Sequence, residues 1–333
     1  MEVRRFRSLC ANMDRLTVGQ IRDLTRKLGE LDARKEVLAR IDGRAQALEH
    51  CLHCGARALV RWGETRTGLQ RLRCKACRRT FSAATGTAVA RIRLPEKLAL
   101  VLRDMLGPAP SSCRALAARL GLDKTTVWRW RMRILAALRG IGAARLAGIV
   151  EADEKYFRES RKGSREWVRH AREPSRFPKP DRPRWRDFHR LGLLLPAGLS
   201  KWQVPVLTLA DRVGARRADM LPDRRAESLV AVLDAHIGAD AVLCSDGDGA
   251  YGLFAHARRL PHYRLNAKTG PKVIDTAFHI QTVNNLHGRF EAFMRPFCGP
   301  ATRYLPGYAA WFVARLAGTR PAQDAAWHRM LAA

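Results

Sequence analysis

Residues 145–157 read RLAGIVEADEKYF, and this stretch decides the fold of the larger part of the chain. The β-branched pair Ile149 and Val150 favours a strand that leads directly into three acidic residues. Because side chains alternate across a strand, Glu151 and Asp153 are expected on one face and Glu154 on the other. A buried strand that delivers carboxylates in this way is a candidate active-site element.

A second apolar run, Ala241–Leu243, is predicted to be a short buried strand that ends at Ser245-Asp246-Gly247. Asp153 and Asp246 thus both follow apolar strands, and carboxylates at the ends of neighbouring strands converge. Metal-assisted phosphoryl transfer needs two or three oxygen ligands around divalent ions about 4 Å apart. A ribonuclease-H-like sheet presents its acids in this arrangement, so Asp153 and Asp246 are the predicted ligands of Mg²⁺ or Mn²⁺.

A later helix packed on the sheet would supply a third ligand. The sequence predicts a helix over Ala277–Met294, in which Asn284, His287 and Glu291 stand at i, i+3 and i+7 and therefore share one face. The same α/β pattern predicts strands over Leu191–Leu195 and Val204–Leu209, and helices over Ala226–Ile237 and Tyr304–Ala317.

Four of the eight cysteines form two CxxC pairs, Cys51 with Cys54 and Cys74 with Cys77. Two such pairs joined by a hairpin complete a tetrahedral site for structural Zn²⁺, the arrangement of a zinc ribbon. Gly63 and Gly68 are candidates for the hairpin turn, and His53 is expected to be a bystander. A redox dithiol is the alternative, which the presence of two pairs disfavours.

Residues 95–140 carry a helix-turn-helix pattern. Helices are predicted over Glu96–Leu106, from a cap at Ser111 through Leu120, and over Lys124–Leu138. A small Ala117, a turn at Gly121 and an apolar Val127 suit the close contact of two helices. The third helix would then present Lys124, Thr125, Trp128 and Arg129 to a DNA major groove; a plain three-helix packing unit is the alternative.

Residues 15–50 are predicted to be helical, with Thr17 as N-cap, and to form a packing helix pair. The alternative is a DNA contact through basic residues of this segment, namely Arg22, Arg26, Lys27 and Arg34.

The net charge of the chain indicates the chemical class of its binding partner. The 333 residues carry a formal net charge of +30, and 50 of the 61 basic residues are arginines. Such an excess argues against an ordinary metabolic enzyme and favours nucleic acid, because guanidinium groups match phosphate oxygens. Residues 158–190 alone hold twelve basic and five acidic residues with four prolines, which predicts a mobile insertion that becomes ordered on a phosphate backbone.

No segment predicts a membrane span or a secretion signal. The longest apolar stretch, 191–199, is too short to cross a bilayer, and the N-terminal MEVRRFRSLC lacks an apolar core. A cytoplasmic, nucleoid-associated protein is therefore expected.

Several stretches resemble, in order, bacterial insertion-sequence transposases that have an N-terminal zinc ribbon and an ISXO-type DDE domain, the fifteen-ninety-five family. They are CLHCGARALVRWG, RLRCKACRRTFSAATGTAVA, VEADEKYF, CSDGDGAY, HIQTVNNLHGRF and GPATRYLPGYAAWF. The resemblance covers residues 15–318. It implies a multidomain chain: a helical region (1–50), a zinc ribbon (51–90), a helix-turn-helix (91–142) and a ribonuclease-H-like catalytic domain (143–320) with the insertion at 158–190.

The resemblance places the family's first two acids on Asp153 and Asp246 and its third position on Asn284. Many relatives carry a lysine two helical turns after this third position, where this chain has Glu291. Glu291 is therefore the alternative candidate for the third ligand. The implied activity is binding to the terminal inverted repeats of the chain's own insertion sequence, followed by metal-dependent strand cleavage and strand transfer by a homodimer or higher oligomer on double-stranded DNA, at element ends and target. The alternatives are a non-enzymatic DNA-binding regulator or an inactive transposase, and a structure-specific nuclease.

Overall fold

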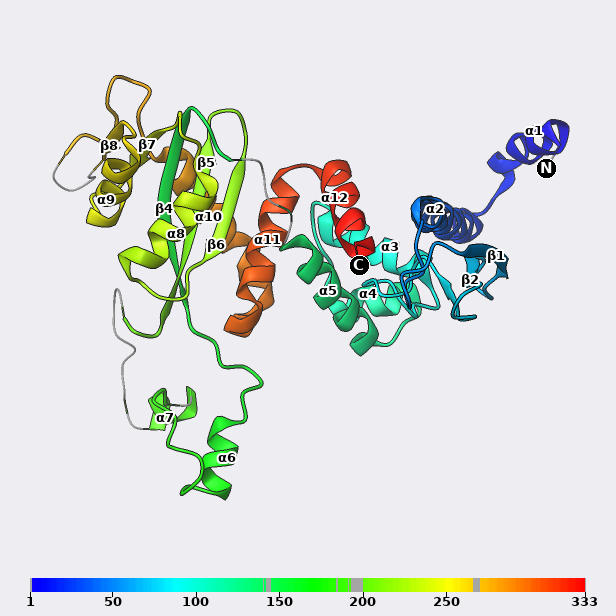
Figure 1. The fold of residues 1–333 in the computed structure, drawn as a ribbon, viewed down its shortest axis with the longest axis horizontal. Coiled ribbons are helices and arrows are strands. Elements are labelled where there is room, and N and C mark those ends of the chain that lie inside the picture. The colour runs from blue at the N-terminus through cyan, green and yellow to red at the C-terminus, as the bar shows by residue number, and fades with distance from the viewer. Residues whose placement is uncertain are drawn as a thin grey trace. The chain divides into compact units, whose positions relative to one another are not determined.

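The computed structural model describes residues 2–139, 141, 145–183, 185–190, 192, 200–265 and 270–332. The chain divides into two compact units, Met1–Ala137 together with Thr319–Ala333, and Leu138–Gly318 (Figure 1). The C-terminal helix α12 (Thr319–Leu331) thus belongs with the N-terminal unit, where it contacts helices α2 (Val18–Ala47) and α3 (Pro95–Leu106).

The N-terminal unit begins with α1 (Val3–Ala11), a 3-10 turn (Met13–Arg15) and the 30-residue helix α2. Thr17 is confirmed as the N-cap: its hydroxyl accepts the Gln20 N–H (3.3 Å), and the Gln20 side chain accepts the Thr17 N–H (2.8 Å). The expected helix pair over this range is wrong. Buried Ala33, Val37 and Ile41 form one stripe at four-residue spacing, and a continuous stripe packs best as a single helix.

A three-stranded antiparallel sheet follows, in the order β1 (Leu59–Glu64), β2 (Gln70–Cys74) and β3 (Thr80–Ser82). Gly68, with φ +82°, lies in the β1–β2 turn as expected. Gly63, with φ +67°, lies instead within β1, where the register with β2 shifts between Arg61 and Glu64.

Helix α3 is followed by α4 (Cys113–Leu120) and α5 (Lys124–Leu138), close to the predicted bounds. Ser112, rather than the predicted Ser111, caps α4 by accepting the Ala115 N–H (3.1 Å), because the Ser111 hydroxyl donates to Asp104 (2.6 Å). Gly121 adopts the left-handed conformation (φ +59°) that the turn requires. Ala117 and Val127 are both buried, as the tight α4–α5 turn predicts.

The second unit contains a five-stranded mixed sheet in the order β6-β5-β4-β7-β8. Its strands are β4 (Ile149–Arg158), β5 (Gln203–Asp211), β6 (Arg216–Met220), β7 (Val242–Ser245) and β8 (His262–Arg264). β4 pairs antiparallel with β5 but parallel with β7, in a register that sets Ala152 beside Ser245. β4 therefore continues beyond the end of β7, and its extension pairs with β5 alone.

Helices cover both faces of this sheet (Figure 1). On one face, α8 (Ala226–His236) and α9 (Gly249–Arg258) pack Leu233 and Phe254 against Val150. On the other, α10 (Gln281–Met294) and α11 (Leu305–Leu316) pack Phe290 and Phe312 against Val206. β5, α8, β7 and α11 fit the predicted elements, whereas β6, α9 and β8 were not predicted.

Helix α10 starts at Gln281, four residues later than predicted. Ile274 and Phe278 exchange backbone hydrogen bonds (both 2.9 Å) in an isolated bridge that encloses a turn at residues 275–277, so the helix cannot begin at Ala277. Apart from Gly192, the strand predicted over Leu191–Leu195 lies outside the described residues.

The basic insertion carries two short helices, α6 (Glu166–Arg172) and α7 (Trp185–Arg190). No helix of the described residues is long and apolar enough to cross a membrane.

Candidate functional site

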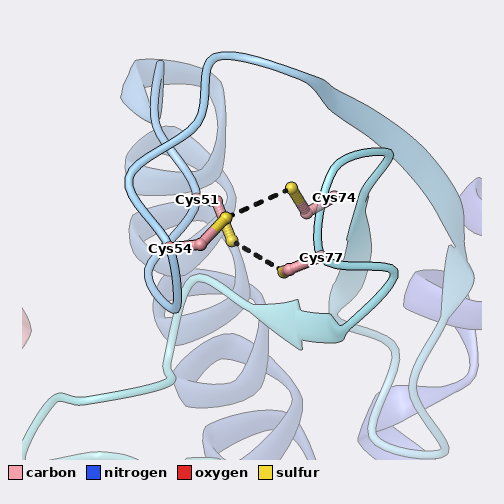
Figure 2. Close-up of side chains that lie close together, drawn as sticks. All are labelled: Cys51, Cys54, Cys74 and Cys77. Atoms are coloured by element: carbon pink, nitrogen blue, oxygen red, sulfur yellow. Dashed lines mark hydrogen bonds between the residues drawn. The ribbon is translucent and has the colours of Figure 1, made fainter.

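The four predicted zinc ligands lie together in the N-terminal unit. Cys51 and Cys54 come from the loop after α2, Cys74 ends β2, and Cys77 lies in the turn before β3. Their four sulfur atoms are all within 4.8 Å of one another, and the two CxxC pairs face each other (Figure 2). The Sγ–Sγ distances are 3.7 Å for Cys51–Cys77 and for Cys54–Cys74. A tetrahedron with Zn–S bonds of about 2.3 Å has edges of about 3.8 Å, so the four thiols fit a structural zinc ion.

The backbone shapes both cysteine loops alike. Gly55 (φ +75°) and Arg78 (φ +59°), each directly after the second cysteine of its pair, adopt the left-handed conformation. Burial acts to raise the pKa of the Cys51 thiol, but hydrogen bonds from the backbone N–H groups of His53 and Cys54, together with those to the Cys54 and Cys77 thiols, lower that pKa to about 7. The His53 ring packs edge-on against Phe81, with ring centroids 5.6 Å apart, as suits a bystander.

Asp153 and Asp246 stand at neighbouring positions of the second sheet. Ala152 and Ser245 are register partners on parallel strands β4 and β7, and each acid is the next residue. Burial, followed by the negative charge of Asp246, raises the pKa of Asp153 to about 7. The structure thus brings the two predicted carboxylates together, close enough for their charges to repel.

Glu154 is a third acid near this pair. Alternation along β4 turns its side chain toward α9, on the face opposite to Asp153. Burial raises its pKa to about 7. A hydrogen bond with Tyr251 opposes this rise, and the charges of Asp153 and Asp246 add to it. The sequence predicts the Glu154 side chain on the face of β4 opposite to Asp153 and indicates no function for it. Its burial within β4 and its proximity to the charges of Asp153 and Asp246 depend on the tertiary fold.

Helix α10 runs alongside β4 in the same direction. Its Val283 N–H donates to Glu151 (3.0 Å), the His287 ring lies 3.8 Å from the Asp153 carboxylate, and Glu291 pairs with Lys155 (3.0 Å). The contacts repeat every four residues of α10 and every two residues of β4, because four residues of helix rise about 6.0 Å and two residues of strand span about 6.6 Å. Of the predicted face, His287 and Glu291 therefore contact the acidic strand, and the third contact comes from Val283.

The three residues on that face have different surroundings. His287 is buried beside Asp153, and its Nε2 lies 2.6 Å from the Thr208 hydroxyl; burial, followed by the nearby Lys155 charge, lowers its pKa to about 4. Glu291 lies one turn farther along, 62% exposed, and its hydrogen bond with Lys155 lowers its pKa. Asn284 lies one turn before His287 with its side chain exposed.

Glu151 anchors the start of α10. Its side chain is 1% exposed and accepts hydrogen bonds from the Thr282 hydroxyl (2.8 Å) and the Val283 N–H (3.0 Å). An Arg212 guanidinium nitrogen lies 2.6 Å from the same carboxylate. An anion at a helix N-terminus is favourable because the first N–H groups have no partner within the helix. Glu151 thus holds α10 against β4, a role that the sequence did not reveal.

Within the described residues, the four cysteines are the only group of three or more His, Cys, Asp or Glu ligand atoms that all lie within 4.8 Å. Asp153 and Asp246, which we call the acidic edge, supply two carboxylates, and a complete site there needs a further oxygen. α10 lies on the same face of β4 as Asp153, whereas Glu154 lies on the other. An asparagine amide oxygen is also a hard ligand of the kind that Mg²⁺ accepts.

The predicted DNA-contact residues lie at the start of α5. Lys124, Thr125, Trp128 and Arg129 are all exposed, while Val127 between them is buried against α4. Asp123 accepts the Thr125 N–H (2.7 Å) and so fixes the first turn of this helix. Lys124 and Arg129 make the exposed side of α5 basic.

Comparisons with known proteins identify the chain's relatives. Residues 145–316 match the ISXO2-like transposase domain. An uncharacterized protein in transposable element ISH50 of Halobacterium salinarum is 30% identical over 223 residues, an alignment that covers 61% of this chain and 66% of that protein. The chain therefore spans slightly less than two thirds of that relative. Because the matched domain includes just over half of the 333 residues, the predicted resemblance is confirmed, and the chain belongs to the ISXO2-like transposase family.

Proposed function

We propose that this chain is an active DDE-type transposase that binds the terminal inverted repeats of its own insertion sequence and cleaves and joins DNA strands. The observation that carries the proposal is the pair Asp153 and Asp246 on adjacent parallel strands. The mixed sheet covered by helices on both faces supports a ribonuclease-H-like catalytic domain, in which such a pair is the catalytic centre.

Asp153 and Asp246 would hold Mg²⁺ or Mn²⁺. The fit rests on their mutual repulsion: a buried carboxyl whose pKa is raised by a neighbouring carboxylate gains when a cation lies between them. When bound, the divalent ion would polarise the scissile phosphate and activate the attacking hydroxyl. His287, buried with a lowered pKa, stays neutral at pH 7 and packs against Asp153, which limits the orientations of that carboxylate.

We assign the third ligand of the divalent ion to Asn284, with Glu291 as the alternative. Glu291 is engaged with Lys155, so using it at the metal would break an ion pair. Asn284 has no charge, and a site of two Asp and one Asn repels an anionic phosphate less than three carboxylates would.

Recognition of double-stranded DNA is assigned to α5, through Lys124, Thr125, Trp128 and Arg129, with Zn²⁺ on the four cysteines as structural support. Exposed Ile21, Leu28 and Leu31 on α2, at 47%, 51% and 55%, support assembly with a second copy, because their seven- and three-residue spacing is that of a helix–helix seam. A protein with these partners would work in the cytoplasm, on the nucleoid.

The test is cleavage of a labelled fragment that ends in the inverted repeats flanking the gene. Wild-type protein should cut with Mg²⁺ or Mn²⁺ and not with EDTA. Asp153→Ala and Asp246→Ala should each abolish cutting yet bind the fragment as before, since removing a carboxylate leaves a basic surface no less attractive to DNA.

The same assay separates the competing functions. A DNA-binding regulator or inactive transposase would bind the fragment and leave it whole under every metal condition. A structure-specific nuclease would cut equally well when the repeats are scrambled. Either result would replace the proposed function.

A further inference from the structure

A cavity of about 760 Å³ lies between the basic insertion, the far end of β4 and the loop at Cys298 and Gly299. Six of its lining residues are basic, and two, Glu159 and Glu166, are acidic. The basic residues are Arg158, Arg161, Lys162, Arg172, Arg182 and Arg186. Its volume falls within the roughly 300–1,000 Å³ of pockets that enclose small organic ligands.

Both acids in the cavity are already neutralised by ion pairs. Glu159 pairs with Arg161 (2.7 Å) and Arg182 (3.4 Å), and Glu166 pairs with Arg161 (3.0 Å). Arg158, Arg172 and Arg186 are exposed, and no ion pair within the described part of the chain involves them. Three arginines therefore line the cavity with their charge available to an anion.

Part of the cavity lining is apolar. Trp167, Val168 and Ala171 from α6 and Pro183 form this apolar wall. The indole N–H of Trp167 donates to the Arg182 carbonyl (3.1 Å), which fixes its ring in place. Val168 is 44% exposed, so the wall is open to a ligand. A lining that combines apolar side chains with guanidinium groups matches a nucleotide, which has a flat base and an anionic phosphate.

The cavity has a defined place relative to the acidic edge. β4 leads from Asp153 to Arg158, and five residues of strand span about 17 Å. Stacked DNA rises about 3.4 Å per nucleotide, so a strand that follows β4 from the acidic edge reaches the cavity after about five nucleotides.

We propose that this cavity binds a nucleotide of an unpaired DNA strand, with its phosphate on Arg158, Arg172 and Arg186 and its base on the Trp167 wall. The inference rests on the proposed transposase function, which brings a cut DNA end to Asp153. An unpaired strand is specified because a base within a duplex is covered by its neighbours and cannot present its face to a side-chain wall.

The experiment compares two triple variants of the full-length protein by fluorescence anisotropy. One removes the cavity arginines (Arg158→Ala, Arg172→Ala, Arg186→Ala). The matched control removes the same charge from exposed insertion residues outside the cavity lining (Arg165→Ala, Lys179→Ala, Arg190→Ala). The probes are a 12-nucleotide oligothymidylate and a 12-base-pair duplex.

The cavity triple should bind the oligothymidylate at least tenfold more weakly than wild type, and its salt-dependence slope should fall by about two, as expected for three lost contacts to a single strand. The control triple should lose less than threefold. Equal losses in the two triples, or an equal loss on duplex and single strand by the cavity triple, would show a general charge effect and overturn the proposal.

Val168→Asn is a second, independent variant. It leaves every charge unchanged and sets a polar amide on the apolar wall at an exposed position, so it should weaken oligothymidylate binding several-fold; unchanged affinity would also overturn the proposal. The inverted-repeat cleavage assay is run on the same wild-type preparation. Failure to cut would refute the proposed function, whereas the binding comparison decides the cavity by itself.

Discussion

Removing the carboxylate of Glu151 should destabilise the second unit and loosen α10. Glu151→Ala leaves the Val283 N–H, on a residue with 0% exposure, without an acceptor, at a cost of about 1–3 kcal/mol. It also leaves Arg212 without its partner. Breaking a buried ion pair by removing one side costs about 3–5 kcal/mol, and Arg212, which is one-third exposed, recovers part of this from water. We therefore expect a total loss of about 3–5 kcal/mol.

The assay is urea unfolding of the full chain together with hydrogen exchange in peptides that cover α10. Glu151→Gln is the informative comparison, because its amide oxygen still accepts the Val283 N–H while the charge toward Arg212 is lost; we expect about half of the alanine effect. Glu227→Ala, at an exposed site on α8, serves as the control and should change stability by less than about 0.5 kcal/mol.

The reasoning would be refuted by a Glu151→Ala protein that unfolds within about 1 kcal/mol of wild type and whose α10 exchanges no faster. That result would mean that the apolar contacts of α10, centred on buried Phe290, hold the helix alone. Faster exchange confined to α10 together with weaker DNA cleavage would support Glu151 as a positioning residue for the α10 side of the site.

Three further predictions concern the other sites. Asn284→Ala should reduce cleavage by at least 100-fold while Glu291→Ala leaves it within threefold; the reverse order in the cleavage assay would transfer the ligand role to Glu291, and full activity of the double variant would exclude both. Native mass spectrometry should find one zinc ion per chain. The Cys74→Ser variant should lose both the zinc and the fold of the ribbon, because a four-thiolate site contributes folding free energy directly. A zinc-free wild-type protein, or a Cys74→Ser variant that keeps its circular dichroism spectrum and DNA affinity, would contradict this prediction. Lys124→Ala combined with Arg129→Ala should weaken binding to the inverted repeats and lower the salt slope by about 1.8, the value for two lost duplex phosphate contacts; an unchanged slope would move recognition to another surface.

Local patterns predicted much of the structure because the responsible forces act over a few residues. Thr17 and Gln20 form a capping box wherever a helix follows them, and Gly121 tolerates the left-handed turn that ends α4. The alternation of Glu151, Asp153 and Glu154 across β4 also follows from strand geometry alone. The prediction of Ser111 as a cap failed because two adjacent serines are locally equivalent, and only the distant Asp104 distinguishes them.

Short-range patterns were sufficient to predict the four-cysteine ribbon, the α4–α5 turn and the apolar strand segments that precede Asp153 and Asp246, since each depends on residue types at short, fixed spacings. Other features could be seen only in the tertiary structure. They are the parallel pairing of β4 with β7, the alignment of α10 along β4, and the hydrogen bond of Glu151 with Thr282 at the start of α10, 131 residues later in the sequence. The tertiary structure also decided that Glu291 pairs with Lys155 and that His287 lies against Asp153. These contacts join segments more than 90 residues apart, and their energies depend on burial and on which charges the fold brings together, quantities that no short stretch of sequence contains.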